Sequence, residues 1–209
     1  MTPSLHPASA GVKLARHLPR RYNVQRMATS RITWHDLLVA PDDGQRYEAI
    51  GGNLYVTPAP SIRHQVISGN LFEALRRLLY HPGHGLVLAA PLGVEFPESE
   101  EGVQPDIVFV RKRRLAIVGA DSIRGAPDLV VEILSPTTAV RDRKLKRDLY
   151  ERQGVAQYWL VDPDAQAVEV WDFAAGKTHP ELHTDDLPVC LGESSFGTIA
   201  LSEVFPRES

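Results

Sequence analysis

Two carboxylates interrupt apolar stretches of this sequence. Asp106 lies within residues 103–110 and Glu132 within residues 129–134, and both stretches are otherwise rich in branched apolar side chains. An ionised carboxylate surrounded by hydrocarbon is unfavourable unless a cation compensates for the lost hydration, and a divalent metal ion often does so. Oxygen ligands favour a hard ion, Mg²⁺ or Mn²⁺, over zinc. In the alternative interpretation, each acid reaches solvent at a strand end or pairs with an arginine.

A basic segment follows the second stretch and is predicted to form a helix. Asp142, Lys146 and Tyr150 recur at intervals of four residues, which places them on one helical face, and two leucines form an adjacent apolar stripe. A helix that packs on a sheet through these leucines could direct Lys146 toward Glu132. In the alternative interpretation, a charge run of this kind forms a solvated helix face.

Several other chemistries find no support in the sequence. It contains neither a glycine-rich phosphate loop ending in Lys-Ser/Thr nor a Gly-x-Ser-x-Gly nucleophile motif. His81 and His84 flank a Pro-Gly turn, but no His or Cys close to them in sequence completes a zinc site. Cys190 is the only cysteine and is interpreted as a packing residue. It excludes a disulfide framework and indicates a reducing compartment, so a cytoplasmic protein is expected.

The chain alternates between helical and strand patterns, which predicts an α/β (α+β) domain with a mixed β-sheet. The predicted elements are helices at 33–39, 61–80 and 138–153, hairpins at 46–56 and 157–173, and strands at 85–96, 103–110 and 128–134. The acidic segment 178–209 is expected to form loops with one or two edge strands. The predicted strand 128–134 and helix 138–153 would hold most of the candidate catalytic residues.

Length and composition narrow the class of protein. The 209 residues are 43% hydrophobic and carry a formal net charge of −3, as expected for one globular domain. No apolar run approaches the roughly 20 residues that span a bilayer, so no membrane partner is expected. Residues 1–26 are rich in arginine and contain no acid. They are expected to be a disordered N-terminal extension, or to precede the true start codon, rather than to be a transit peptide, and residues 27–209 to form a single domain.

An ordered series of sequence blocks resembles the bacterial Uma-type restriction endonuclease family. The blocks are residues 47–54 (Tyr-Glu-Ala-Ile-Gly-Gly-Asn-Leu), 61–68, 104–106 (Gln-Pro-Asp), 125–136, 146–150 and 157–163. The resemblance covers residues 28–205 and implies a restriction-endonuclease-like mixed β-sheet flanked by helices. It places the chain in the superfamily named for its Pro-Asp…(Asp/Glu)-x-Lys motif. The implied activity is hydrolysis of phosphodiester bonds in nucleic acid, with DNA as the expected substrate and Mg²⁺ (or Mn²⁺) as the cofactor.

The family motif maps onto the two strand carboxylates. The resemblance implies that Asp106 and Glu132 are metal ligands and that the backbone carbonyl of Ile133 joins the metal shell. The chain departs from the motif at the next position, where Leu134 stands in place of lysine. The lysine that matches is Lys146, in the following helix.

Four further residues are assigned through the same resemblance. Glu48 matches an early glutamate that completes the acidic site and is therefore a catalytic candidate. Lys144 is the second choice for the catalytic lysine. His64 lies in a matching block but has no assigned role, and Tyr158 is expected to give structural support.

Nucleic-acid binding is expected to depend on phosphate contacts. Two basic segments, 111–114 and 141–147, are candidates for gripping the backbone, which predicts weak sequence preference and steep salt dependence. In the alternative interpretation, 111–114 is a solvated loop. A homodimer would present two active sites to the two strands of a duplex.

Two other classes of function remain open from the sequence. The domain could be a nucleic-acid-binding module on the same fold with an inactive site, since lysine is missing from the usual motif position. It could also be a protein-interaction module, because residues 163–209 contain 9 acidic and 2 basic residues and could dock a basic partner.

Overall fold

A six-stranded mixed sheet forms the centre of the computed structural model, which describes residues 31–41, 43–136 and 138–205. Its strands, in spatial order, are β11 (Glu181–His183), β10 (Ala167–Asp172), β9 (Gln157–Asp162), β8 (Leu129–Ile133), β6 (Ile107–Arg111) and β3 (Gly85–Ala89). β8 and β9 are parallel, and the other neighbours are antiparallel. The predicted extension over residues 1–26 lies outside the described residues.

A second, five-stranded sheet lies against one face of the first. Its order is β2 (Asn53–Thr57), β1 (Arg46–Ile50), β5 (Glu101–Val103), β4 (Gly93–Phe96) and β7 (Ser122–Arg124). β1 and β2 form the predicted hairpin. The sequence suggested one sheet, whereas the described residues contain this second sheet and a separate two-stranded one.

Two predicted strands are each divided between the two large sheets. β5 ends at Val103 and β6 begins at Ile107, with Gln104-Pro105-Asp106 between them. Pro105 has no N–H to donate to a strand ladder, so the apolar run cannot continue as one paired strand. Residues 85–96 divide in the same way, into β3 and β4. As a result, Asp106 lies at the point where the chain passes from one sheet to the other.

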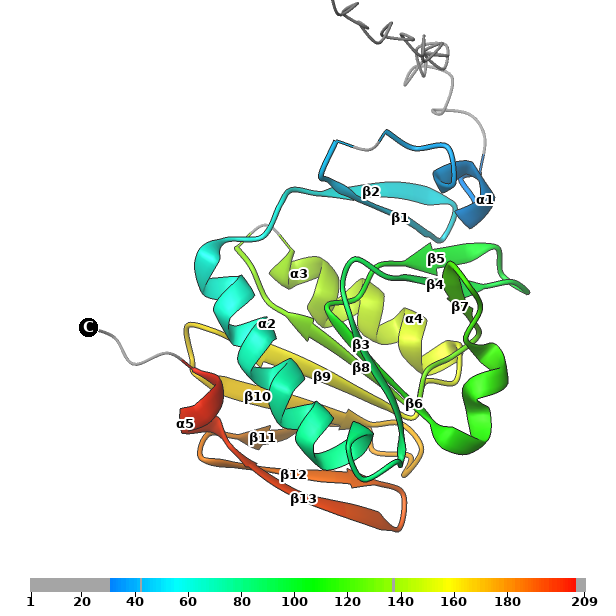
Figure 1. Cartoon of the computed structure of the whole chain (residues 1–209). Coiled ribbons are helices and arrows are strands. Elements are labelled where there is room, and N and C mark those ends of the chain that lie inside the picture. Colours follow the sequence, from blue (N-terminus) through cyan, green and yellow to red (C-terminus); the bar gives the residue numbers. More distant parts are fainter. Residues whose placement is uncertain (1–30, 42, 137, 206–209) are drawn as a thin grey trace, which may run out of the picture. The chain divides into compact units, whose positions relative to one another are not determined.

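Successive side chains of β6 point to opposite faces of the sheet and contribute to two hydrophobic cores. Ile107 and Phe109 pack in a core with the long helix α2 (Ile62–Leu75), and Figure 1 shows this helix lying along the six-stranded sheet. Val108 and Val110 pack in a second core, between the two large sheets and α4 (Arg147–Arg152). Both faces of the central strands are therefore buried, which explains their almost continuous apolar sequence.

Both predicted long helices form, and each contains a π-helical turn. Ser61 caps α2 by accepting a hydrogen bond from the His64 N–H at 3.2 Å, and α2 continues into a π-helical turn, Arg76–Tyr80. The predicted 138–153 helix consists of α3 (Ala139–Arg141), a π-helical turn over Asp142–Lys146, and α4. π-Helical turns are uncommon and frequently occur at functional sites. No helix among the described residues is long and apolar enough to cross a bilayer.

The C-terminal acidic segment is more structured than its sequence suggests. It contains β11, the hairpin of β12 (Asp186–Leu191) and β13 (Ser194–Ala200), and α5 (Leu201–Val204). Leu187, Ile199 and Val204 are fully buried in the core beneath α2. The expectation of loops with one or two edge strands was wrong, because alternate residues of β12 are apolar and pack into the core. The described residues are completed by α1 (Trp34–Leu37) and a 3₁₀ turn, Lys112–Ile117.

Candidate active site

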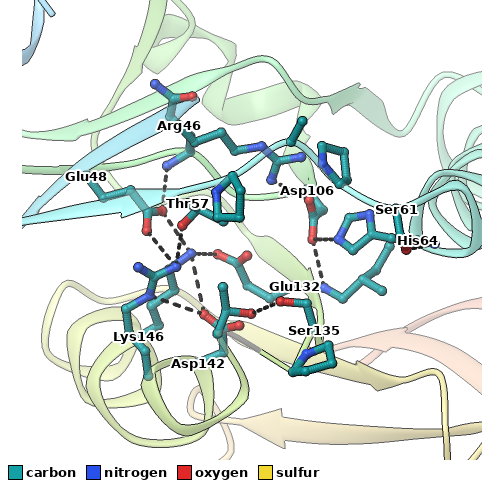
Figure 2. A pocket seen from close by; sticks show the side chains of 18 residues that line it. Arg46, Glu48, Thr57, Ser61, His64, Asp106, Glu132, Ser135, Asp142 and Lys146 are labelled. Atoms are coloured by element: carbon teal, nitrogen blue, oxygen red, sulfur yellow. Dashed lines mark hydrogen bonds and ion pairs between the residues drawn. The ribbon is translucent and has the colours of Figure 1, made fainter. Parts of the chain in front are cut away.

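Three of the predicted site residues, Glu48, Asp106 and Glu132, line one pocket between the two large sheets. Asp106 and Glu132 share the strand parity of Val108 and Val130, whose side chains face the second sheet and α4. Glu48 approaches from β1 of that second sheet (Figure 2). All three carboxylates are almost completely buried, with exposed fractions of 1% to 3%.

Lys146 joins two of these carboxylates. Its Nζ lies 2.8 Å from Glu132 Oε1 and 2.8 Å from Glu48 Oε1, and 3.7 Å from Asp142 Oδ1 one turn earlier. The Tyr150 hydroxyl also donates to Glu132 Oε1, at 2.7 Å. The helical face deduced from the spacing therefore meets the strand carboxylate. Lys144, the second choice, is exposed and does not line the pocket.

Asp106 has a different set of partners. The Arg46 guanidinium lies 2.5 Å from Asp106 Oδ1, and His64 Nε2 lies 3.2 Å from Oδ2. The backbone N–H of Ile133 donates to Oδ2 at 2.8 Å. Ile133 was expected to contribute its carbonyl to a metal, and the contact seen here is a different one: its N–H orients the aspartate.

These side chains line a single pocket of about 200 Å³. Its ionisable lining residues are Arg46, Glu48, His64, Asp106, Glu132, Arg141, Asp142 and Lys146. Glu48 Oε2 and Asp142 Oδ1 are buried without a hydrogen bond, although Arg141 Nη2 lies 3.5 Å from the former. Four carboxylates thus share the pocket with two arginines, one lysine and one histidine, so many charged groups are crowded into a small buried volume.

Burial and crowding shift the pKa values in this pocket. Burial, reinforced by the charges of the other three carboxylates, outweighs Lys146 and raises the pKa of Glu132 to about 8. Burial acts in the same direction on Asp106, but the hydrogen bond and charge of His64 and the charge of Arg46 lower its pKa to about 2. The surrounding carboxylates raise the pKa of Lys146 above its usual value despite burial. The pKa values of the two carboxylates are therefore shifted in opposite directions, which favours the protonated form of Glu132 and the ionised form of Asp106.

The donor set matches a hard divalent ion in its chemistry. Every acidic group contributes carboxylate oxygen, and two of the buried oxygens lack a hydrogen-bond donor. Within the described residues, no group of three His, Cys, Asp or Glu side chains is already arranged as a metal cage. An arriving ion would compete with the Arg46 guanidinium for Asp106 and would share Glu132 with Lys146.

Sequence reasoning missed two arginines of the site. Arg46 lies two residues before Glu48 on β1, and residues two apart on a strand share a face. That rule alone could have identified Arg46 once Glu48 was chosen. Arg141 was included only in the general basic segment, because its approach to Glu48 depends on how α3 packs against the hairpin.

The remaining candidates lie outside the pocket. Tyr158 stacks on Tyr150 at 4.9 Å between ring centroids and donates to the Asp142 carbonyl at 3.1 Å, a supporting position. His84 packs on the Phe196 ring rather than on other metal-binding side chains. The basic segment 111–114 lies at the far end of β6 from Asp106.

Comparison with known proteins places the chain in a family. The model of the family Uma2, described as "Putative restriction endonuclease", matches residues 34–201. The chain belongs to the Uma2 family. This confirms the resemblance noted from the sequence blocks. No curated protein matches this Uma2 chain.

A solved structure supports the fold assignment. It is described as a "putative nuclease belonging to DUF820" from Anabaena variabilis, and it is similar to this Uma2-family protein with a TM-score of 0.65 and 23% sequence identity. The match covers 83% of this chain and 97% of that one. At this identity the likeness shows the fold, a single domain of mixed sheets flanked by helices.

Proposed function

We propose that this protein is a metal-dependent endonuclease that hydrolyses phosphodiester bonds in DNA. Membership of the Uma2 family and the nuclease-like fold support the nuclease class. The observation that carries the proposal is the position of Lys146. It comes from a helix yet lies 2.8 Å from Glu132, so it supplies the cation that Leu134 cannot supply at the motif position.

Asp106 and Glu132, with the Ile133 carbonyl, would hold the metal at the scissile phosphate. A bound Mg²⁺ or Mn²⁺ supplies positive charge to that phosphate and lowers the pKa of a water. Lys146 orients the attacking water and stabilises the negative charge that develops on the phosphoryl oxygens. Glu48 holds the Lys146 ammonium at 2.8 Å and thus fixes its direction. In-line attack would leave a 5′-phosphate and a 3′-hydroxyl.

The proposal extends to the oligomeric state and the cellular location of the protein. A homodimer would place two such sites on the two strands of a duplex. With Cys190 as the only cysteine, the protein suits a reducing compartment, and we assign it to the bacterial cytoplasm.

Cleavage of labelled duplex DNA, single-stranded DNA and RNA tests the proposal. Each substrate is incubated with Mg²⁺, Mn²⁺ or EDTA, with wild type, Asp106→Asn and Lys146→Met. Lys144→Met is the matched control, because Lys144 belongs to the same helical segment but is exposed outside the pocket. We expect metal-dependent cleavage of duplex DNA that the first two variants lose and the control retains.

Two results would contradict the proposal. Undiminished cleavage by folded Asp106→Asn would show that another site acts. A folded wild type that cleaves none of the substrates and gives no heat with Mg²⁺ in calorimetry would identify a binding module with an inactive site.

A further inference from the structure

Arg46 occupies the boundary between two hollows of the surface. Its side chain is 19% exposed, and its guanidinium contacts Asp106 at 2.5 Å inside the active-site pocket. It also lines a larger neighbouring hollow of about 750 Å³. Of the ionisable residues, Arg46 and His64 line both hollows.

The two hollows differ in charge. The active-site pocket contains four carboxylates. The neighbouring hollow is lined by amide, hydroxyl, apolar and glycine residues together with Arg46 and His64, and none of the described residues that line it is acidic. Its polar side chains besides these two are Gln45, Tyr47, Gln65, Ser68 and Gln104. Asp43 accepts hydrogen bonds from the Gln45 and Tyr47 side chains beside this hollow, but the active-site pocket holds four carboxylates, so a polyanion would enter beside Arg46 rather than over them.

Arg46 and a divalent ion compete for the same carboxylate. In this structure Arg46 is the nearest full positive charge to Asp106 Oδ1. A dication bound at Asp106 would repel the guanidinium and take over its role as counter-ion. The long side chain can then turn into the neighbouring hollow, where a phosphate is its natural partner because a guanidinium binds phosphate oxygens through paired N–H donors.

We propose that Arg46 is a metal-responsive phosphate ligand: it neutralises Asp106 in the metal-free protein, and metal binding releases it to grip the phosphate adjacent to the scissile one. This inference rests on the proposed function. It couples metal and nucleic acid, since each ligand raises the affinity for the other by the same factor. The coupling would keep the protein from holding DNA firmly before the metal is in place.

Calorimetric titration of Ca²⁺ tests the competition without cleavage. Ca²⁺ is a hard ion with a preference for oxygen ligands. Arg46→Met should bind Ca²⁺ about tenfold more tightly than wild type, because a competing cation has been removed. Arg77→Met is the control; Arg77 forms an exposed pair with Glu203 and lines neither hollow, and its loss should leave Ca²⁺ affinity unchanged.

The salt dependence of duplex DNA binding tests the release. One lost phosphate contact reduces the slope of log K against log salt by about 0.9. With Ca²⁺ present, Arg46→Met should show this reduction relative to wild type. In EDTA the two slopes should coincide, since Arg46 is then occupied by Asp106. Arg77→Met should match wild type in both conditions.

The outcomes separate this inference from the function on which it rests. Equal or weaker Ca²⁺ affinity of folded Arg46→Met, or equal slopes with Ca²⁺, would overturn the inference while leaving a cleaving wild type intact. If Arg46→Met lowers the slope equally with Ca²⁺ and in EDTA, Arg46 binds phosphate but the metal does not control it, which also overturns the proposal. A wild type that neither binds the ion nor cleaves DNA would overturn both.

Discussion

Two Pro-Asp dipeptides open neighbouring strands, and they end up in different environments. Pro105-Asp106 precedes β6 and Pro127-Asp128 precedes β8. Because these strands are antiparallel, the two aspartates lie at opposite ends of the pair. Both are buried, with exposed fractions of 2% and 4%, and both contact two basic side chains.

The difference lies in what surrounds each aspartate. Asp128 accepts the Arg111 backbone N–H at 2.9 Å and contacts Arg114 at 3.1 Å, and it lines none of the hollows described above. It is one carboxylate between two arginines and is fully compensated. Asp106 opens into a pocket that also contains three more carboxylates. Residue type and local motif are therefore equal at the two ends, and a cavity shared with three further carboxylates distinguishes the candidate site.

Replacing each aspartate in turn should separate cleavage from stability, and the loss of cleavage is the largest effect we expect. Asp106→Asn should lower cleavage by about a thousandfold, roughly 4 kcal/mol in the barrier, because the metal loses a charged ligand. Its free energy of unfolding should also fall, by about 2 kcal/mol, because Arg46 loses its counter-ion and because the lowered pKa of Asp106 means that the fold stabilises the ionised carboxylate. Rate measurements and urea unfolding on the same preparations provide both values.

Asp128→Asn should lower stability without lowering cleavage. It should destabilise the fold by about 2 kcal/mol, because two partly buried arginines lose their counter-ion. Cleavage per folded molecule should remain at the wild-type level. If Asp128→Asn abolished cleavage while remaining folded, the distinction between the two ends would fail.

The crowded carboxylates should also make stability depend on pH. The pKa of Glu132 is raised to about 8, so between its unfolded value and pH 8 the native state binds more protons than the unfolded state. Stability must then fall as pH rises through this window, with a limiting slope of about 1.4 kcal/mol per pH unit. Unfolding in EDTA at pH 6, 7 and 8 measures this fall.

Glu132→Gln should abolish most of this pH dependence, since the amide does not ionise. Glu193→Gln is the matched control, because Glu193 is exposed in the turn between β12 and β13. A slope that persists in Glu132→Gln would show that another group titrates, and the account of the charged pocket would need revision.

The smallest expected effect concerns two arginines, one in the pocket that contains Asp106 and one beside Asp128. Arg141 lines the pocket, so Arg141→Met should reduce the salt slope of DNA binding by about 0.9. Arg114 is engaged by Asp128 and by the Ala126 carbonyl, and Arg114→Met should leave the slope unchanged. A reduced slope for Arg114→Met would restore segment 111–114 as a nucleic-acid contact and extend the binding surface to the far end of β6.

Local sequence patterns were sufficient to predict most helices and strands and the pairing of Lys146 with Glu132. The capped helix after Ser61, the 46–57 hairpin and the apolar strands follow from short-range rules that depend on neighbours in sequence. Periodicity also placed Lys146 on the face that meets Glu132. Sequence failed where a proline divided an apolar run between two sheets, because periodicity does not say which sheet a strand joins.

The sequence alone determined which residues could carry charge into the core: Asp106 and Glu132 within apolar strands, and Lys146 at the right helical spacing. Only the tertiary structure decided which buried aspartate joins other carboxylates in a pocket. Asp106 and Asp128 have the same local sequence signature, and the partners of each come from segments distant in the chain, such as Arg46, which is 60 residues from Asp106. Electrostatic energy depends on distances in space, so the balance of charge in the pocket exists only after the two sheets have packed together.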